Sequence, residues 1–186
     1  KIMNGTYTVL ASENDFCYLS DIPYDTKQSK PGWGSIHINE TDSGSNFSVK
    51  IEGAFYSFEK GIWAHASSTM VYDLTNYQGY DYFTAYMGVN SSSGNNGNGV
   101  KFYIYTSTDG KNWDLKTEDN PPVIKSSNNA IPVKIDIRGV KLLKLVANDN
   151  GSNGNDHSVY VDTKLIKGTY KEPGEELVPD IEELDN

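Results

Sequence analysis

The chain has 186 residues, a formal net charge of −9 and one cysteine, Cys17. This length suits one compact domain with a substantial core, followed by a tail. A lone cysteine excludes an intrachain disulfide. The sequence has no basic patch, which argues against nucleic acid or an anionic membrane surface as a partner. No run approaches the roughly 20 apolar residues of a membrane-spanning helix, so membrane insertion is not expected.

Most of the negative charge comes from the C-terminal end. From Lys171 onward seven acidic residues accompany one lysine, a net charge of −6 that leaves −3 for the remaining residues. This end contains Pro173 and Pro179 and lacks a periodic apolar face. We therefore expect one domain over residues 1–170 and an acidic linker or tail over residues 171–186. A linker implies a neighbouring domain.

The body of the chain shows repeated strand signals. Its 13 Tyr and 17 Gly suit strands joined by tight turns. In Val100–Thr106 every second residue is apolar, and the following Asp109-Gly110 is typical of a hairpin turn. Strands are predicted at Thr6–Leu10, Phe16–Leu19, Phe47–Ile51, Ala54–Phe58, Ile62–Ala66, Thr69–Leu74, Tyr80–Val89, Val100–Thr106, Trp113–Thr117, Val133–Ile137, Leu142–Val146 and Ser158–Ile166. Short strands with frequent turns predict an all-β, antiparallel β-sandwich or jelly roll.

Two polar loops interrupt these strands. Asn90–Gly99 consists almost entirely of Asn, Ser and Gly, and Asn148–His157 is equally polar. Such loops cannot bury apolar surface, so they are expected outside the sandwich. Each is either a flexible turn or part of a binding site.

The sequence lacks recognisable catalytic motifs. His37, His65 and His157 are isolated, without the His-Glu-x-x-His spacing of zinc enzymes, and no Gly-x-Ser-x-Gly elbow is present. Cys17 lies in an apolar run, where a buried and inert thiol is favoured over a nucleophile. We therefore expect a binding domain without catalytic activity of its own.

A series of segments matches one known family in order and spacing. They are Tyr18–Tyr24, Gly32–Gly34, Lys60–Ala66, Tyr72–Leu74, Phe83–Val89, Val100–Tyr105, Asp136–Gly139, Leu142–Leu145 and Asn155–Asp162. Together they resemble the NPCBM family, also called carbohydrate-binding module family 51, from about Tyr18 to Ile166. One departure is Tyr160, at a position where the family often has Trp.

The resemblance implies a galactose-binding-like β-sandwich attached to a secreted bacterial glycoside hydrolase or metalloprotease. It implies binding of host glycans that end in galactose, N-acetylgalactosamine or related blood-group-type sugars. Tethering to a catalytic domain, a secreted or cell-surface location and a monomeric state are expected with it.

The resemblance also implies a structural calcium ion, because sandwiches of this superfamily commonly hold one between loops. Calcium requires six to eight oxygen ligands, many of them backbone carbonyls. Asp21 and Asp162 are the acids expected first to ligate it, since both lie in matching segments near strand ends. Asp42 and Asp73 are further candidates. Alternatively, Asp21 and Asp162 only form hydrogen bonds within the fold.

A sugar site needs a flat aromatic ring for the C–H face of the sugar and polar groups for its hydroxyls. A hydroxyl buried without a partner costs about 1–3 kcal/mol. Trp63 and His65, two apart in one strand, share a face, and Asn155, Asp156 and His157 close the second polar loop. If the two regions meet, they form a small site with a ring, an imidazole and a carboxylate. Alternatively, Trp63 and His65 are core residues, and Asp156 and His157 cap a strand.

Three further residues are candidates for sugar contact. Trp33, between two glycines, is either an exposed aromatic platform or a lid on the end of the sandwich. Glu59 and Lys60 precede the strand of Trp63 and are either sugar contacts or solvated surface. Asn95 and Asn96 either line the rim of the site or, as is favoured, belong to a solvated and mobile loop.

Two other functions stay open. A protein-binding adhesion sandwich would carry an exposed apolar patch. A small glycoside hydrolase would carry two acids about 5–9.5 Å apart beside a groove. A pocket that combines an aromatic ring with His and Asp would favour sugar binding instead.

Overall fold

The computed structural model describes residues 15–172. The predicted strand Thr6–Leu10 and residues 173–186 of the predicted tail lie outside the described residues. Within residues 15–172 the regular elements are strands and two 3-10 turns, η1 (Leu19–Asp21) and η2 (Thr75–Tyr77). None of the helical turns in this part of the chain is long and apolar enough to cross a membrane.

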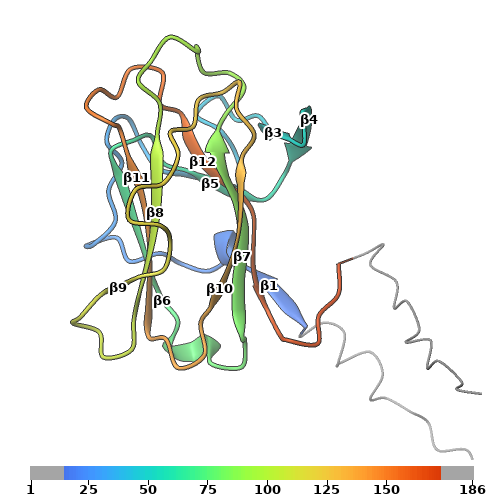
Figure 1. Cartoon of the computed structure of the whole chain (residues 1–186). Coiled ribbons are helices and arrows are strands. Elements are labelled where there is room, and N and C mark those ends of the chain that lie inside the picture. Colours follow the sequence, from blue (N-terminus) through green and yellow to red (C-terminus); the bar gives the residue numbers. More distant parts are fainter. Residues whose placement is uncertain (1–14, 173–186) are drawn as a thin grey trace, which may run out of the picture.

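Two antiparallel sheets form a sandwich (Figure 1). Sheet A has the order β10-β7-β12-β5-β2, with β1 paired to β12, and sheet B has the order β6-β11-β8-β9. The strands of sheet A are β1 (Phe16–Tyr18), β2 (His37–Ile38), β5 (Gly61–Trp63), β7 (Tyr82–Val89), β10 (Ile131–Asp136) and β12 (Ser158–Ile166). Those of sheet B are β6 (Ser68–Asp73), β8 (Lys101–Ser107), β9 (Asp114–Leu115) and β11 (Leu142–Asn148). This architecture confirms the predicted all-β sandwich.

The main core lies between the two sheets. Alternating residues supply it, as in β8, where Phe102 and Ile104 are buried and Tyr103 is half-buried. From sheet A, Tyr160 meets Phe102 edge-on, with the ring centroids 5.6 Å apart. Burial of each large apolar side chain contributes about 1.5–3 kcal/mol. Tyr160, the residue that departs from the family pattern, therefore serves the core.

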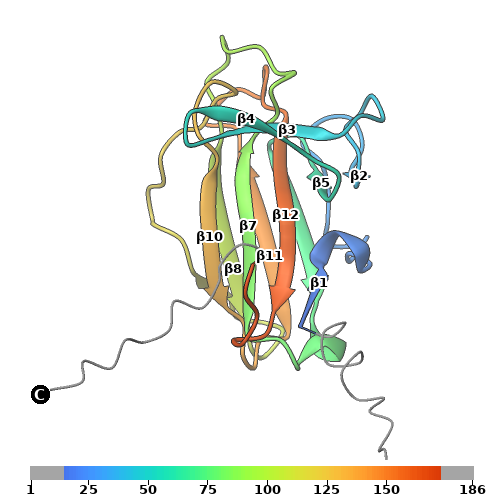
Figure 2. The same ribbon diagram turned by 90° about the vertical axis from the view of Figure 1, so that its right-hand side faces the viewer.

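A hairpin covers part of the outer face of sheet A (Figure 2). Its strands β3 (Phe47–Ile51) and β4 (Ala54–Phe58) form a two-stranded sheet of their own. The hairpin and sheet A bury a second apolar cluster between them, made of Phe47, Val49, Trp63, Ala130, Val159 and Val161. Sheet A is therefore covered on both faces at this end of the sandwich.

Most strand predictions are confirmed, with small shifts at their ends. The hairpin strands and β12 have the predicted bounds. The strand predicted at Ile62–Ala66 is too long, because the chain leaves sheet A after Trp63. Strand β2 was not predicted, since two residues leave no period to detect.

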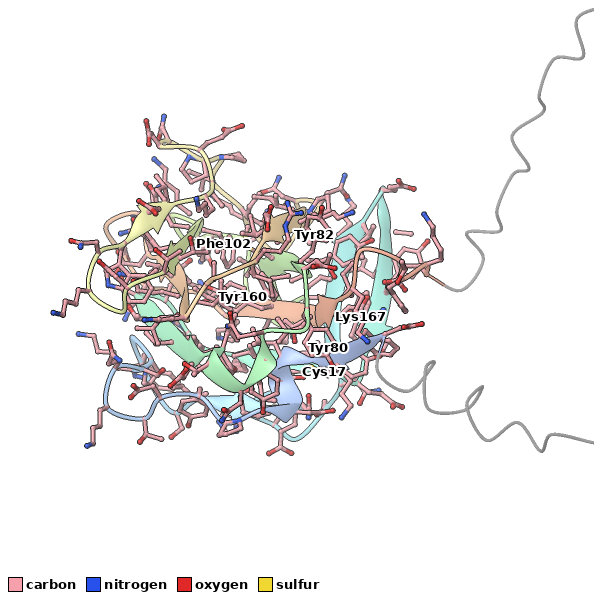
Figure 3. The ribbon with its side chains drawn as sticks, turned by 90° about the horizontal axis from the view of Figure 1, so that it is seen from below. Cys17, Tyr80, Tyr82, Phe102, Tyr160 and Lys167 are labelled. Atoms are coloured by element: carbon pink, nitrogen blue, oxygen red, sulfur yellow. The ribbon has the colours of Figure 1, made fainter. Side chains whose placement is uncertain are left out.

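Cys17 lies in β1 beside Tyr80 (Figure 3). Burial raises the pKa of the Cys17 thiol above its ordinary value, and a hydrogen bond with Tyr80 opposes this shift only in part. A thiol that stays protonated is a poor nucleophile. Cys17 is half-buried, not fully buried as its apolar run predicted, and its inert role stays a prediction.

Candidate functional site

The two polar loops lie at the same end of the sandwich, at the top of Figure 1. They contact each other at Gly97, where an added Cβ would lie 2.0 Å from the carbonyl oxygen of Gly154. The side-chain amide of Asn155 donates to Asn96 Oδ1 at 2.6 Å, and the hydroxyl of Ser93 donates to the Asn155 carbonyl. The loops therefore brace each other through the exposed Asn96, whose place at the rim of a sugar site stays a prediction.

The segment that carries Trp33 joins this end of the molecule through Gly32. The N–H of Gly32 donates to the carbonyl of His65 at 2.8 Å. A Cβ on Gly32 would lie 2.0 Å from the backbone nitrogen of Ser67, so no other residue fits there without a shift of the backbone. This close approach carries the neighbouring Trp33 to the chain that leaves β5.

Four aromatic rings follow one another across these segments. The centroid of Trp33 lies 5.8 Å from that of His65, which lies 5.3 Å from that of His157. The ring of His157 in turn lies 4.9 Å from that of Trp63. Residues predicted from three separate parts of the sequence thus meet in one group, which we call the ring group.

The two tryptophans of the ring group have different surroundings. Trp33 is 66% exposed, whereas Trp63 is 3% exposed and packs in the second apolar cluster. Only Trp33 can offer an open ring face to a sugar. Trp63 supports the ring of His157 from the interior.

The two imidazoles lie mostly inside the fold: His65 is 5% exposed, and His157 is half-buried, with an Nδ1 that has no hydrogen-bond partner within residues 15–172. The Nδ1 of His65 lies 2.8 Å from the carbonyl oxygen of Ala66. A carbonyl can only accept, so Nδ1 carries a proton and donates it to Ala66, which leaves Nε2 as the other polar atom of the His65 ring. Burial and the proximity of His65 lower the pKa of His157, which favours the neutral form of the His157 ring. Neutral imidazoles both donate and accept, as sugar hydroxyls require.

The carboxylate of Asp156 lies inside the fold instead of facing solvent. The residue is fully buried, and neither carboxylate oxygen has a hydrogen-bond partner within residues 15–172. Burial raises the pKa of Asp156 to about 6, although the nearby charge of His65 acts in the opposite direction. The backbone of Asp156 holds the site together, because its carbonyl accepts from the N–H groups of Ala66 and Ser158.

Glu59 and Lys60 precede β5, at the strand end opposite His65. The ammonium group of Lys60 contacts both carboxylate oxygens of Asp21, at 2.7 and 2.9 Å, and lies 5.6 Å from the ring centroid of Tyr18. Glu59 is exposed. Neither residue joins the ring group, so both have the solvated or structural role that the sequence left open.

The acids predicted as calcium ligands both have lysine partners. Asp21 binds Lys60, accepts from the side-chain amide of Asn39 at 2.8 Å, and has a lowered pKa as a result of these contacts, which outweigh burial. Asp162 lies 3.4 Å from the ammonium group of Lys164. Residues 15–172 also contain no cluster of three or more His, Cys, Asp or Glu side chains suited to a metal. These two acids, already neutralised by lysines, do not fit a calcium site, and the ion stays a prediction.

Sequence reasoning missed the residues that position the ring group. Gly32 was quoted only as a neighbour of Trp33, and Asn90 only as part of a polar loop. The buried Asn90 accepts from the N–H of Ser48 at 2.8 Å and so ties its loop to the hairpin. Nothing in the sequence indicates such contacts, because the partners are more than 30 residues apart.

The NPCBM/NEW2 domain family matches residues 15–166. No curated protein matches the chain.

Solved structures of similar domains also match. A CBM51 from Clostridium perfringens GH95, in complex with methyl-galactose, is 30% identical, with a TM-score of 0.71, and the match covers 81% of this chain and 99% of that one. The CBM51-2 and INT domains of ZmpB from the same organism, in complex with GlcNAc, are 28% identical, with a TM-score of 0.68 and coverage of 82% and 31%. A structure of the ZmpB M60 catalytic domain with CBM51-1 and CBM51-2 is 31% identical, with a TM-score of 0.68 and coverage of 82% and 15%.

Proposed function

The chain belongs to the NPCBM/NEW2 domain family, and from this premise we propose that it is a non-catalytic carbohydrate-binding module. Its ligands are host glycans that end in galactose, N-acetylgalactosamine or a related blood-group-type sugar. The module holds an attached glycoside hydrolase or metalloprotease near those glycans, outside the bacterial cell, and acts as a monomer.

The observation that carries this proposal is the ring group. An exposed Trp33 beside His65 and His157 supplies an aromatic face next to polar ring nitrogens. That is the combination by which a protein recognises a pyranose, whose C–H face is apolar and whose edge carries hydroxyls. The buried Trp63 and Asp156 hold the ring group in place from the interior.

The choice of a galactose-type sugar rests on similarity and on the two imidazoles. A similar domain is described in complex with methyl-galactose and another in complex with GlcNAc. Two adjacent imidazoles can hold neighbouring hydroxyls together, which suits the axial 4-hydroxyl of galactose. We therefore rank galactose and N-acetylgalactosamine above N-acetylglucosamine.

The attachment to an enzyme also rests on similarity. One similar structure contains two CBM51 domains beside an M60 catalytic domain. The proposal assigns no catalysis to this chain, because Asp156 beside the ring group is fully buried, whereas a glycosidase needs two acids at a groove.

Titration calorimetry with methyl-galactose, N-acetylgalactosamine and N-acetylglucosamine tests the proposal. We expect a Kd of about 10 μM to 1 mM for the first two sugars. Such weak binding suffices when several sites or an attached enzyme raise the effective concentration at the glycan. Trp33→Ala and His65→Ala should each weaken binding at least about tenfold, or about 1.4 kcal/mol.

Phe55→Ala is the matched control, because Phe55 is 55% exposed but lies on the hairpin, outside the ring group. It should leave affinity unchanged. The proposal fails if none of the sugars binds, or if folded Trp33→Ala and His65→Ala bind them like the parent chain.

Calcium remains a proposal that only the family resemblance supports. Since Asp21 and Asp162 do not fit it, the ion would have to rely on backbone carbonyls elsewhere. Melting temperatures in EDTA and in calcium chloride test this. A higher Tm in calcium supports a bound ion, because a ligand that binds only the folded state stabilises it, and equal values refute it.

A further inference from the structure

A second cavity lies on the outer face of sheet A, away from the ring group. Figure 2 shows strands β10, β7 and β12 in the interval between the β3–β4 hairpin and the segment that follows β12. A cavity of about 490 Å³ is hollowed there. Its floor includes Thr84 and Tyr86 of β7 and Lys134 of β10, and its wall includes Tyr170 and Glu172. This volume is within the usual range for a small-molecule site.

A β-bulge in β12 supplies a carboxylate to this cavity. The pairing of β12 with β7 shifts between Val161 and Lys164, so an extra residue is inserted there. Asp162, inside the bulge, has a φ of 51° and lines the cavity. A non-glycine residue in the left-handed region is strained, and such strain is often kept where a side chain must be aimed at a site.

A buried lysine fixes the two acids of the cavity. The side chain of Lys164 is 6% exposed, and its ammonium group contacts the Glu172 carboxylate oxygens at 2.8 and 2.9 Å and that of Asp162 at 3.4 Å. The ring centroids of Phe16 and Tyr170 lie 5.3 and 5.7 Å from the same nitrogen. The segment that carries Tyr170 and Glu172 is therefore fastened to sheet A, which makes the wall a fixed feature.

The cavity presents charges of both signs. Lys134 and Lys171 line it together with Asp162 and Glu172, and the buried Lys164 pairs with both acids from below. An anionic ligand would meet the two acids and a cationic one the two lysines, while an apolar ligand would desolvate all four charges. A neutral ligand rich in hydroxyls can pair with both signs, because a hydroxyl donates to carboxylates and accepts from ammonium groups.

We propose that this cavity is a second carbohydrate subsite, which takes one neutral, hydroxyl-rich sugar unit. Asp162 accepts from sugar hydroxyls, Lys134 and Thr84 supply donors, and the rings of Tyr86 and Tyr170 cover C–H groups. The subsite shares no residue with the ring group. It therefore extends the proposed function and can be tested without it.

Backbone-amide NMR titrations with galactose and with N-acetylglucosamine test the subsite. We expect one of these sugars to shift amides of Thr84–Tyr86, Pro132–Lys134 and Asp162, where an amide proton exists, separately from amides near His157. Asp162→Asn should raise the Kd obtained from the first set of shifts at least about tenfold. Asn adopts the left-handed region with little strain, so this variant keeps the bulge.

Two further variants make the outcome decisive. Thr84→Val removes one hydroxyl from the floor of the cavity with little change in volume and should also weaken the first set of shifts. Asp114→Asn is the matched charge control on the exposed part of β9, and it should change neither set.

His65→Ala should remove the shifts near His157 and leave those at the cavity. If the parent chain shows no shifts near His157, or if these shifts survive in His65→Ala, while the cavity set appears, the ring-group proposal fails and the subsite stands. The subsite is refuted if neither sugar moves the cavity amides, or if Asp162→Asn and Thr84→Val both bind as tightly as the parent chain.

Discussion

Asp156 and His157 are neighbours in sequence, yet their surroundings shift their protonation equilibria in opposite senses. Burial raises the pKa of Asp156 to about 6 and lowers the pKa of His157. In both cases the neutral form is favoured, since burial penalises charge whatever its sign. At this scale both shifts reduce the charge next to the ring group, which suits a ligand without charge.

Asp156 should make stability depend on pH. Its pKa is raised on folding, so its contribution is fully present below pH 4 and is lost as the pH rises through about 6. His157 acts oppositely, because a lowered pKa makes its contribution fade as the pH falls below about 6.5. In Asp156→Asn the first effect is absent, so the Tm of this variant minus that of the parent chain should rise between pH 4 and pH 7. A constant difference across that range would contradict the assignment of the raised pKa.

At the scale of elements, β12 organises the molecule. It pairs with β1, β5 and β7, its first residue follows His157, and its bulge aims Asp162 at the second cavity. The hairpin supports it from outside, since Val159 and Val161 pack with Phe47 and Val49. A change on the buried side of the hairpin, at Phe47 or Val49, should therefore reach the ring group through Trp63.

The close approach at Gly32 gives an element-scale prediction. Gly32→Ala forces apart the Trp33 segment and the chain at Ala66–Ser67, so sugar affinity should fall at least about tenfold, measured by calorimetry. Gly79→Ala is the control, because a Cβ there meets nothing within 4 Å and its φ is not in the left-handed region. It should leave affinity unchanged. It can also stabilise the fold by about 0.4–1 kcal/mol, because alanine reduces the conformational entropy of the unfolded chain. Equal affinity of the two variants would remove the argument for Gly32.

The hairpin gives a second prediction at this scale. Phe47 is fully buried, whereas Phe55 in the opposite strand is 55% exposed. Phe47→Ala should cost about 3–5 kcal/mol in denaturant unfolding, because it empties part of the second cluster. Phe55→Ala should change stability by less than about 0.5 kcal/mol. Similar losses for both would mean that the hairpin does not pack as described.

At the scale of the whole molecule, the ring group lies at one end and the second cavity on one face of the same sandwich. The acidic residues 173–186 follow directly after Glu172, a wall residue of that cavity. The sequence predicts a linker there, and the structure describes the chain up to the ion pair of Glu172 with Lys164. Lys171 and Glu172, which the sequence assigns to the linker over residues 171–186, therefore pack with the folded module, and its border is expected beyond them.

Two truncations test this border. Removal of residues 173–186 should leave the Tm within about 2 °C of the full chain, since a linker adds no core. Removal of residues 171–186 also takes Glu172 from the buried Lys164 and should cost about 1 kcal/mol, a modest value because Glu172 is partly exposed. That loss lowers the Tm of a domain this size by about 2–4 °C. Identical melting of the two shortened chains would place the border elsewhere.

The sequence by itself determined the all-β class, the polar loops and the family, because alternation, turn residues and spaced motifs are local signals. It also identified Trp33, Trp63, His65 and His157, each of which lies in or next to a matching segment.

Only the tertiary structure decided which of them meet and which are exposed. Trp33 and Trp63 have the same chemistry, but one faces solvent and the other lies under a hairpin. Lys60, a predicted sugar contact, pairs with Asp21. Asp162, a predicted calcium ligand, pairs with Lys164. The second cavity combines residues of three strands and a terminal segment. Burial and charge pairing depend on contacts between distant parts of the chain, so no local pattern could have determined them.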